Sequence, residues 1–372
     1  MSHPRDRAGE DVAEIASQFA IDGEFLDAEP YGSGHINATY VSGVRQGRRV
    51  VRYVHQRINH TIFTSPEKVM ENIVRVTAHI RAKLVAAGAD PCRRVLTVVP
   101  TVDGQSFLKT PGGEYWRTYL FVEGARTYDV IEDPEHVYAA GKAFAEFQER
   151  VADLPGPRLY ETIPHFGNAV KRLEALDEAV RRDPAGRVRA AGNEIDFVTA
   201  RRATVSMFED LRLAGAVPER IIHYDTKTNN VLIDDRTGEG ICVIDLDTVM
   251  PGLAMFDFGD AVRMGAAAAA EDERDLARVS MDLAMFDRLT CGYLRTASRF
   301  LTRCEVDHLA ASPRLVTLTQ GMRFLTDYLS GDVYYKTARA EHNRDRCRTQ
   351  FRMVQDMEAK ADRMEEIVAR YR

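Results

Sequence analysis

The sequence predicts a two-lobed α+β protein in which a small, mostly antiparallel sheet precedes a larger, mostly helical part. The chain has 372 residues, which is long for a single hydrophobic core. Up to about Gly124, short strand-like runs are separated by turn-forming glycines and prolines. Beyond Gly124, apolar residues recur with helical spacing, except around a polar loop at 221–262. We therefore expect one lobe at residues 1–123 and a second at residues 124–372.

The N-terminal lobe is expected to contain a sheet and one long helix. A short amphipathic helix at 8–20 leads into a glycine-bearing hairpin, and a β-rich segment follows at 48–59. A serine, a proline and a glutamate then have the order of a helix start, and the apolar spacing predicts a helix over 65–88. Two further strands are expected around 95–100 and 115–124.

The C-terminal lobe is expected to be helical. Helical spacing covers 133–152, 166–183, 192–214 and most of 268–371. The alanine run at 266–270 is expected to begin a helix, because alanine favours helices more than any other residue. This lobe should therefore supply most of the hydrophobic core.

Composition and charge exclude several classes of protein. The formal charge of -6 disfavours nucleic-acid binding, which rewards clustered Lys and Arg. Five scattered cysteines suggest neither a metal knuckle nor a disulfide framework. The polar N-terminus lacks the apolar core of a signal peptide, and no apolar run approaches membrane-spanning length. We expect a cytoplasmic protein whose partners include no membrane and no nucleic acid.

The stretch most informative about chemistry is IIHYDTKTNNVLID, at 221–234. In it, Asp225 is followed by Lys227 and Asn230, and a second acid, Asp245, ends the next apolar strand. This is the spacing of a kinase catalytic loop, H-x-D-x-K-x-x-N, with a metal-binding Asp beyond it. A single Asp or Asn in a loop is most often a turn former, but four matched positions between two apolar strands favour the kinase interpretation. We therefore expect a bilobal, protein-kinase-like fold.

Phosphoryl transfer explains these residue types. The reaction needs an acceptor hydroxyl held in line and the phosphate charge neutralised. We assign Asp225 to the acceptor hydroxyl and its proton, and Lys227 to the transferring γ-phosphoryl group of ATP. The oxygens of Asn230 and Asp245 suit Mg²⁺, which selects oxygen ligands. His223 is expected to brace the loop backbone.

The triplet Asp257-Phe258-Gly259 matches the metal-binding motif of protein kinases by letter only. It lies 32 residues beyond Asp225 and does not follow a strand. We therefore keep Asp245 as the metal ligand. Asp257 or Asp260 is expected to cap the helix at 261–269 and to hold the catalytic loop by accepting backbone N–H bonds.

A glycine-bearing turn at 31–37 is the candidate clamp for the nucleotide phosphates. Glycine lets a backbone approach phosphates where a Cβ would block it. An ordinary hairpin turn is the alternative, but the order of turn, strand, helix and catalytic loop favours the clamp. The residues assigned to nucleotide binding here are Gly32, Ser33, Gly34, His35 and Asn37.

The strand after this turn lacks the lysine that protein kinases place there. We assign that role to Gln56 or Arg57. Glu71 on the following helix is the expected partner of Arg57, with Glu67 one turn earlier as the alternative. A solvated surface pair that adds little stability is an equally open interpretation.

A hinge segment is expected where the last strand of the sheet ends. Phe121 and Val122 occupy this position, and the backbone there would contact adenine. Any buried strand has a similar pattern, so this assignment depends on position alone.

With these residues identified, the chain resembles the aminoglycoside phosphotransferase and choline kinase superfamily, and within it the N-acetylhexosamine 1-kinases. The resemblance covers nearly the whole chain. The catalytic-loop string alone indicates the superfamily, and the other strings narrow it. These strings are GSGHINATY at 32–40, QRINHTIFTSPEKVMENI at 56–73, HYDTKTNNVLID at 223–234, CVIDLDTVMPGLAMFDFGDAVR at 242–263 and RFLTDYLSGDVYYKT at 323–337.

The resemblance implies ATP- and Mg²⁺-dependent phosphorylation of the C1 hydroxyl of an N-acetylhexosamine. It also implies that the sugar lies between Asp225 and the segment that carries Arg323, Tyr334 and Tyr335. An arginine can donate a fork of hydrogen bonds to sugar oxygens, and an aromatic face can stack on a pyranose. The helical apolar spacing around Arg323 leaves open that some of these aromatics are core residues.

Two alternatives stay open. The same machinery could phosphorylate a hexose, an amino sugar, an aminoglycoside or an amino alcohol. Acceptors with a cation usually need an acidic pocket, and only Asp327 and Asp332 lie near the sugar segment, which disfavours aminoglycosides. The second alternative is a nucleotide-binding module that no longer transfers phosphate. The sequence is compatible with a monomer or a homodimer.

Overall fold

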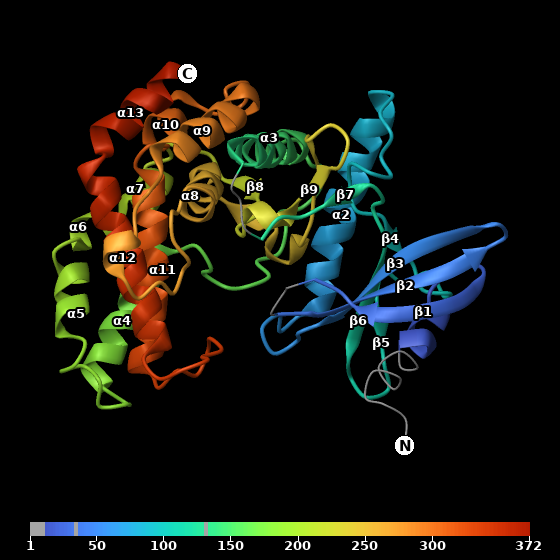
Figure 1. The fold of residues 1–372 in the computed structure, drawn as a ribbon, viewed down its shortest axis with the longest axis horizontal. Helices are drawn as coiled ribbons and strands as arrows, with labels where there is room; N and C mark the ends of the chain where they lie inside the picture. The colour runs from blue at the N-terminus through green and yellow to red at the C-terminus, as the bar shows by residue number, and fades with distance from the viewer. Residues whose placement is uncertain (1–11, 33–35, 130–132) are drawn as a thin grey trace.

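The computed structural model describes residues 12–32, 36–129 and 133–372, and it has the predicted α+β architecture with two lobes (Figure 1). The sheet lobe is built on one antiparallel sheet, drawn on the right in Figure 1. Its strands follow the order β1-β2-β3-β6-β4, and β5 also pairs with β6. They are β1 (Glu24–Pro30), β2 (Ala38–Gln46), β3 (Arg49–Ile58), β4 (Val98–Val99), β5 (Leu108–Lys109) and β6 (Tyr115–Leu120).

Helix α2 (Pro66–Ala86) connects the two lobes, and it begins with the predicted proline. Its apolar face packs against the sheet and also against side chains of the helical lobe, so one core cluster spans both lobes. Asn72, fully buried on this helix, donates to the carbonyl oxygens of Tyr160 and Val249, at 2.8 and 3.0 Å, and accepts from Tyr160 N at 3.1 Å. These bonds fix α2 to the loop that follows the candidate metal ligand.

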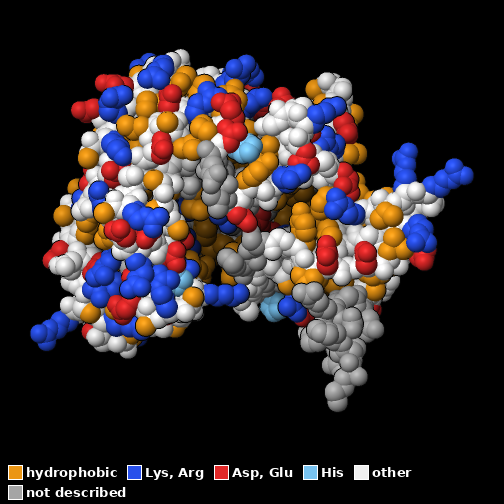
Figure 2. Space-filling model, in the orientation of Figure 1, with side chains coloured by type: hydrophobic (Ala, Val, Ile, Leu, Met, Phe, Trp, Pro, Cys, Tyr) orange, Lys and Arg blue, Asp and Glu red, His pale blue; other side chains and the backbone are white. Residues whose placement is uncertain are grey.

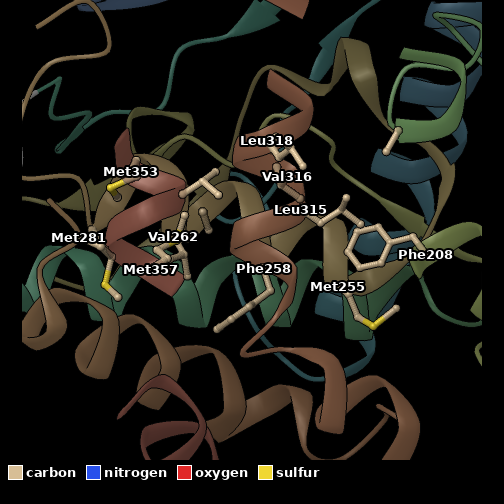
Figure 3. Close-up of a cluster of buried hydrophobic side chains, with 14 of the residues drawn as sticks. Phe208, Met255, Phe258, Val262, Met281, Leu315, Val316, Leu318, Met353 and Met357 are labelled. Carbon is tan, nitrogen blue, oxygen red and sulfur yellow. The ribbon is translucent and has the colours of Figure 1, made fainter. Parts of the chain in front are cut away.

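The helical lobe, drawn on the left in Figure 1, contains the largest cluster of buried side chains. Figure 3 shows part of this core, where Phe258 and Leu315 come from neighbouring helices. The helices are α3 (Pro134–Val151), α4 (Ala169–Arg182), α5 (Gly192–Thr199), α6 (Arg202–Val205), α7 (Met207–Leu213), α8 (Ala254–Gly265), α9 (Leu283–Ala297), α10 (Arg303–His308), α11 (Ser312–Leu329), α12 (His342–Ala359) and α13 (Ala361–Arg370). Within the described ranges, no helix is long and apolar enough to cross a bilayer.

Short strands of the helical lobe position the polar loops. They form two small sheets, one in the order β10-β9-β7 and one that pairs β11 with β8. The chain leaves the large sheet after Leu120 and pairs with β9 from Ala125 onward. The strands are β7 (Ala125–Arg126), β8 (Arg220–Ile222), β9 (Val231–Asp234), β10 (Gly240–Val243) and β11 (Met250–Gly252).

Two helix predictions are wrong in detail. The segment 192–214 forms three short helices instead of one, and Arg201, at the first break, pairs with Glu358 on the distant helix α12. The alanine run at 266–270 does not begin a helix. Its backbone pairs with a distant segment instead, since Ala268 N donates to the Ser280 carbonyl at 3.0 Å. Tertiary pairing overrides the helix propensity of alanine here.

Helices α3 and α9 pack closely because each has a glycine at the contact. A Cβ on Gly141 would lie 2.7 Å from the carbonyl oxygen of Leu289, and a Cβ on Gly292 would overlap with the carbonyl oxygen of Tyr138. The obstacles are backbone atoms, which cannot rotate away. Helix α3 also supports the catalytic loop, so this close approach helps to place the site.

We expect Gly292→Ala to lower the free energy of unfolding by about 1–3 kcal/mol, because the added methyl group forces α3 and α9 apart. Chemical denaturation monitored by circular dichroism measures this. Gly192→Ala is the matched control, since a Cβ on Gly192 meets no atom within 4 Å. Equal stability of the two variants would contradict the packing argument.

Candidate active site

The catalytic loop lies between β8 and β9, and its charged groups meet as the spacing predicts. The carboxylate of Asp225 accepts hydrogen bonds from Lys227 at 2.9 Å and from the side-chain amide of Asn230 at 3.1 Å. The same Asn230 amide donates to the Asp225 carbonyl oxygen at 2.8 Å, which closes the loop. Burial alone would raise the pKa of Asp225, but the nearby Lys227 ammonium holds that pKa below its usual value. Asp225 is therefore a carboxylate at neutral pH.

Two buried carboxylates of α8 hold the loop backbone, which confirms one part of the prediction for Asp257 and Asp260. Asp257 accepts from His223 N at 2.8 Å and from Tyr224 N at 2.7 Å, and Asp260 accepts from Thr226 N at 3.0 Å. The capping role is wrong, because α8 begins at Ala254, three residues before Asp257. The bonds let Tyr224 keep a left-handed conformation, with φ of 67°, directly before Asp225.

The triplet Asp257-Phe258-Gly259 lies inside helix α8 and is not a metal-binding loop. Phe258 is fully buried in the core of the helical lobe (Figure 3). A Cβ on Gly259 would lie 2.9 Å from the Ser312 carbonyl oxygen, so this glycine allows α8 to approach α11. Helix packing therefore accounts for Phe258 and Gly259 at these positions.

His223 braces the loop, as predicted. Asp225 N donates to His223 Nδ1 at 3.3 Å, and His223 Nε2 donates to the Ile244 carbonyl oxygen at 2.8 Å. The rings of Phe144 and Phe147 contact the imidazole edge-on. The histidine therefore links the catalytic loop to the strand that leads to Asp245.

Asp245 follows β10 in a left-handed conformation, with φ of 58°. Burial, together with the charges of Asp247 and Asp225, raises the pKa of Asp245 to about 7. Three carboxyl groups thus lie near one another. A divalent cation would relieve their repulsion.

The donor set beside Asp225 fits magnesium. Asn230 uses its amide nitrogen on Asp225, so its carbonyl oxygen is the atom left to bind a cation, and Asp245 offers a carboxylate. The backbone N–H of Ile244 donates to the backbone carbonyl of Asn230 at 2.9 Å, which keeps Asn230 close to Asp245 and does not use the side-chain oxygen of Asn230. Magnesium is typically held by one or two protein oxygens plus phosphate and water oxygens.

A buried ion pair joins the two lobes directly behind Asp245. Arg117 on β6 is 1% exposed and pairs with Asp247, whose side chain is 3% exposed. Asn37 donates to the same Asp247 carboxylate at 2.7 Å, and Gln56 accepts from Arg117 Nε at 3.0 Å. Although burial opposes its charge, Asp247 raises the pKa of the Arg117 guanidinium.

Arg117 is the buried cation that sequence reasoning missed. Gln56 and Arg117 are cross-strand neighbours in the β3–β6 pair, so Gln56 orients the arginine. A signal was present, because Arg117 interrupts an otherwise apolar and aromatic strand, YWRTYL. A charged residue inside such a strand is rarely buried without a partner.

The expected pairing of Arg57 with Glu71 or Glu67 is wrong. Arg57 pairs with Glu114 at 2.7 Å on the exposed surface, because β3 lies beside β6 and not beside α2 at this point. Glu67 accepts from the Tyr115 hydroxyl at 2.7 Å. Glu71 is exposed and has no ion pair with any described residue.

The predicted hinge lies beside an aromatic and cationic surface. The guanidinium of Arg52 lies 3.8 Å above the Phe121 ring, and Tyr31 meets that ring edge-on at 5.7 Å. Val122 is buried in the core that spans both lobes.

In the glycine-bearing turn at 31–37, Gly32 has a φ of 80°, the left-handed region that favours glycine. The assigned residues Ser33, Gly34 and His35 lie outside the described residues.

The predicted sugar segment meets the catalytic loop through an aromatic ring. The guanidinium of Arg323 on α11 lies 5.0 Å from the Phe166 ring and 5.6 Å from the Tyr335 ring. Phe166 in turn meets Tyr224, the neighbour of Asp225, at 5.7 Å. Tyr334 is 54% exposed and meets Tyr335 edge-on. Tyr335 is partly buried and packs against the core of the helical lobe, where its ring lies 4.7 Å from that of Phe324.

Asp327 fixes this segment in the way that Asp257 fixes the catalytic loop. Its carboxylate accepts from the backbone nitrogens of residues 333, 334 and 335, at 2.9, 2.8 and 3.0 Å. The next residue, Lys336, lines a cavity of about 480 Å³ together with Asn37 and Arg57 of the sheet lobe. The segment therefore faces the sheet lobe, and the space-filling view is hollowed between the lobes (Figure 2).

These features define a kinase-like phosphotransferase fold, with an antiparallel sheet lobe, a helical lobe and a catalytic loop between them. Residues 27–289 match the phosphotransferase enzyme family known as APH. Because the match covers more than half of the sequence, the chain belongs to this family.

Solved structures share the fold at low sequence identity. An aminoglycoside phosphotransferase from Alicyclobacillus acidocaldarius is similar with a TM-score of 0.58 and 14% identity, covering 100% of this chain and 98% of that chain. A spectinomycin phosphotransferase in complex with ADP and spectinomycin has a TM-score of 0.58 and 12% identity, covering 95% and 98%. A choline kinase from Cryptosporidium parvum has a TM-score of 0.56 and 14% identity, covering 95% and 96%.

We expect Arg117→Met to lower the free energy of unfolding by about 3–5 kcal/mol, because Asp247 would stay buried without its cation. Urea denaturation measures the loss. Arg45→Met is the control, since Arg45 pairs with Glu24 on the exposed surface, where a pair contributes about 0–1 kcal/mol. If Arg117→Met loses no more unfolding free energy than the control, the buried ion pair does not contribute to stability as argued.

Asp257→Asn tests the loop support through its pH dependence. Burial raises the pKa of Asp257 to about 6 from an ordinary value of 3.8, so folding favours its protonated form. Wild-type stability relative to Asp257→Asn should therefore fall as pH rises from about 4 to about 6, by roughly 1–3 kcal/mol, and stay constant above that. Urea denaturation of both proteins at several pH values measures this, and a pH-independent difference would contradict it.

Proposed function

We propose that this protein transfers the γ-phosphoryl group of ATP to the anomeric hydroxyl of an N-acetylhexosamine. One observation carries the proposal: Asp225, Asn230 and Asp245 converge on a single site between the lobes. An acceptor hydroxyl, a nucleotide and a metal must meet at such a point for phosphoryl transfer. The family match supports the phosphotransferase reaction, and the choice of acceptor is our inference from the site and from resemblance.

Asp225 is the group that would meet the acceptor hydroxyl. Its low pKa keeps it ionised, so it accepts a hydrogen bond from the hydroxyl and orients the oxygen toward the γ-phosphorus. As the new O–P bond forms, the bond between the γ-phosphorus and the β–γ bridging oxygen of ATP breaks and ADP leaves with that electron pair. The hydroxyl proton becomes acidic in this step and passes to the carboxylate. Lys227, held at 2.9 Å from Asp225, brings positive charge to the transferring group.

Asn230 and Asp245 would hold magnesium. When bound, the metal neutralises charge on the phosphate oxygens. His223 keeps Asp245 in register with Asp225, since its ring bonds to the backbone N–H of Asp225 and to the backbone carbonyl of Ile244, the neighbour of Asp245. The donor oxygens therefore need little rearrangement on binding, which lowers the entropic cost of forming the site.

The sheet lobe would bind the nucleotide, with residues 1–123 as the nucleotide-binding unit. The turn that contains Gly32 would approach the phosphates, and the backbone at Phe121 and Val122 would contact adenine. Arg117, rather than Gln56 or Arg57, supplies the positive charge of this lobe nearest to Asp245. The spectinomycin phosphotransferase that was solved in complex with ADP supports a nucleotide in this cleft.

The acceptor would lie between Asp225 and the side chains of Arg323, Tyr334 and Tyr335. A sugar is favoured over the cationic acceptors named for the structural relatives, because the nearby carboxylates are already engaged. Asp327 is occupied by backbone N–H groups, and Asp332 pairs with Arg187 at 2.6 Å. Little negative charge is left to receive an ammonium group.

Asp225→Asn should lower kcat for N-acetylglucosamine or N-acetylgalactosamine by about 10²- to 10⁴-fold, because the amide cannot take the proton. Phosphorus NMR detects the sugar 1-phosphate, and calorimetry measures ATP binding, which should persist. Asp235→Asn is the control, since Asp235 pairs with Arg126 on the surface.

Two outcomes would reject parts of this assignment. Unchanged turnover in Asp225→Asn would reject the role of Asp225. If the wild-type protein with ATP and Mg²⁺ forms no 1-phosphate from any N-acetylhexosamine but phosphorylates choline or an aminoglycoside, the acceptor assignment is wrong.

A further inference from the structure

Two arginines of the acceptor region lie together without an acidic partner. Arg172, on the first turn of α4, and Arg323, on α11, are both partly buried. Neither forms an ion pair with any residue in the described ranges. Burial, together with the charge of Arg323, lowers the pKa of the Arg172 guanidinium. The two like charges therefore destabilise each other.

Their hydrogen-bonding capacity is only partly used. Arg172 donates to the Phe166 carbonyl oxygen at 3.2 Å, but its Nε is buried and has no hydrogen-bond partner in the described structure. Arg323 donates to the side-chain oxygen of Gln320 at 2.8 Å. The rings of Phe166 and Tyr335 flank the Arg323 guanidinium. Guanidinium N–H groups therefore remain without an acceptor among the described residues, next to these two aromatic rings.

Carboxylates near the pair are committed to other groups. Glu271, which acts electrostatically on Tyr335, pairs with Arg263 at 2.9 Å. Asp327 and Asp332 are occupied as described above. Elsewhere in the helical lobe, partly buried arginines do meet carboxylates. For example, Arg220 pairs with the buried Glu305 at 2.6 Å.

An unpaired, partly buried cation pair costs folding free energy, because water is removed and no anion replaces it. Such an arrangement is expected where a ligand supplies the missing charge. Two guanidinium groups with free N–H donors suit a carboxylate or a phosphate, which they can bind with charge-assisted hydrogen bonds. The aromatic neighbours suit the apolar face of a sugar ring.

We propose that Arg172 and Arg323 form an anion subsite, and that the preferred acceptor is an acidic N-acetylhexosamine with a carboxylate or phosphate group away from C1. This inference rests on the proposed function, since it names the substrate class for the same site. Phe166 lies between this subsite and the catalytic loop, in contact with Arg323 on one side and Tyr224 on the other. An anchored acidic group would therefore hold the sugar while C1 faces Asp225.

The test compares kcat/KM for N-acetylglucosamine with that for derivatives carrying a carboxylate or a phosphate at C3, C4 or C6 in turn. We expect at least one acidic derivative to be preferred by about ten- to hundredfold, as one or two charge-assisted hydrogen bonds would give. Carboxylate and phosphate derivatives at the same carbon distinguish the two anions. Arg172→Gln should reduce the preference severalfold or more, whereas Lys171→Gln, on the exposed side of the same turn, should keep it.

The possible failures are distinguishable. If the neutral sugar is phosphorylated as well as every acidic derivative, the anion subsite is overturned and the proposed function stands. If no sugar is phosphorylated, the proposed function fails. Thermal shifts with inorganic phosphate and citrate then decide the subsite, which stands only if these anions stabilise the wild type more than Arg172→Gln.

A second measurement guards against a variant that fails to fold. Without any anion, Arg172→Gln should melt about 2 °C higher than the wild type, because a repelled, partly buried charge has been removed. A lower melting temperature would mean that the positive charge of Arg172 stabilises the fold, which contradicts a cation without an anionic partner.

Discussion

The catalytic loop keeps its shape because two buried carboxylates on one helix accept its backbone N–H groups. The carboxylate oxygens of Asp257 and Asp260 accept hydrogen bonds from backbone N–H groups of the loop. In the described structure these N–H groups have no acceptor within the loop itself, so the loop depends on the two carboxylates. The left-handed conformation at Tyr224 persists because these bonds over-determine it. The direction in which the Asp225 carboxylate points follows from that geometry. Helix α8 packs closely against α11 at Gly259. The packing of the helical lobe therefore also fixes the position of the catalytic loop.

Much of this arrangement could be predicted from the sequence because its signals are local. The order of sheet, helix and catalytic loop follows from spacing and turn residues, and so does the meeting of Asp225, Lys227 and Asn230 within one loop. The start of α2 at Pro66 is equally local. The pairing of Arg57 could not be predicted, because it depends on which strand lies beside β3, and strand order is not encoded at short range.

The roles of Arg117 and Arg172 could not be predicted for the same reason, because both depend on contacts between segments far apart in the sequence. A buried arginine is recognisable in sequence only when its carboxylate partner can be found, and Asp247 lies 130 positions from Arg117 along the chain. Arg172 has the pattern of an ordinary surface residue on an amphipathic helix. Its closeness to Arg323 arises because α4 packs against α11, a contact that links segments far apart in sequence. Sites built from several helices are therefore read less completely from sequence than sites built on one loop.

The contact between Asp247 and the pair Arg117 and Asn37 has a consequence for motion. It is a buried, charged link between the lobes, and Asp247 lies two residues from the proposed metal ligand Asp245. If the lobes separated widely, the buried guanidinium of Arg117 and the buried carboxylate of Asp247 would lose their ion pair and become exposed to water. If the sheet lobe binds the nucleotide as proposed, the product nucleotide would leave by smaller movements near Gly32 and Tyr31, while the contact at Asp247 stays closed. Each turnover would in that case proceed without repeated reassembly of the proposed metal site.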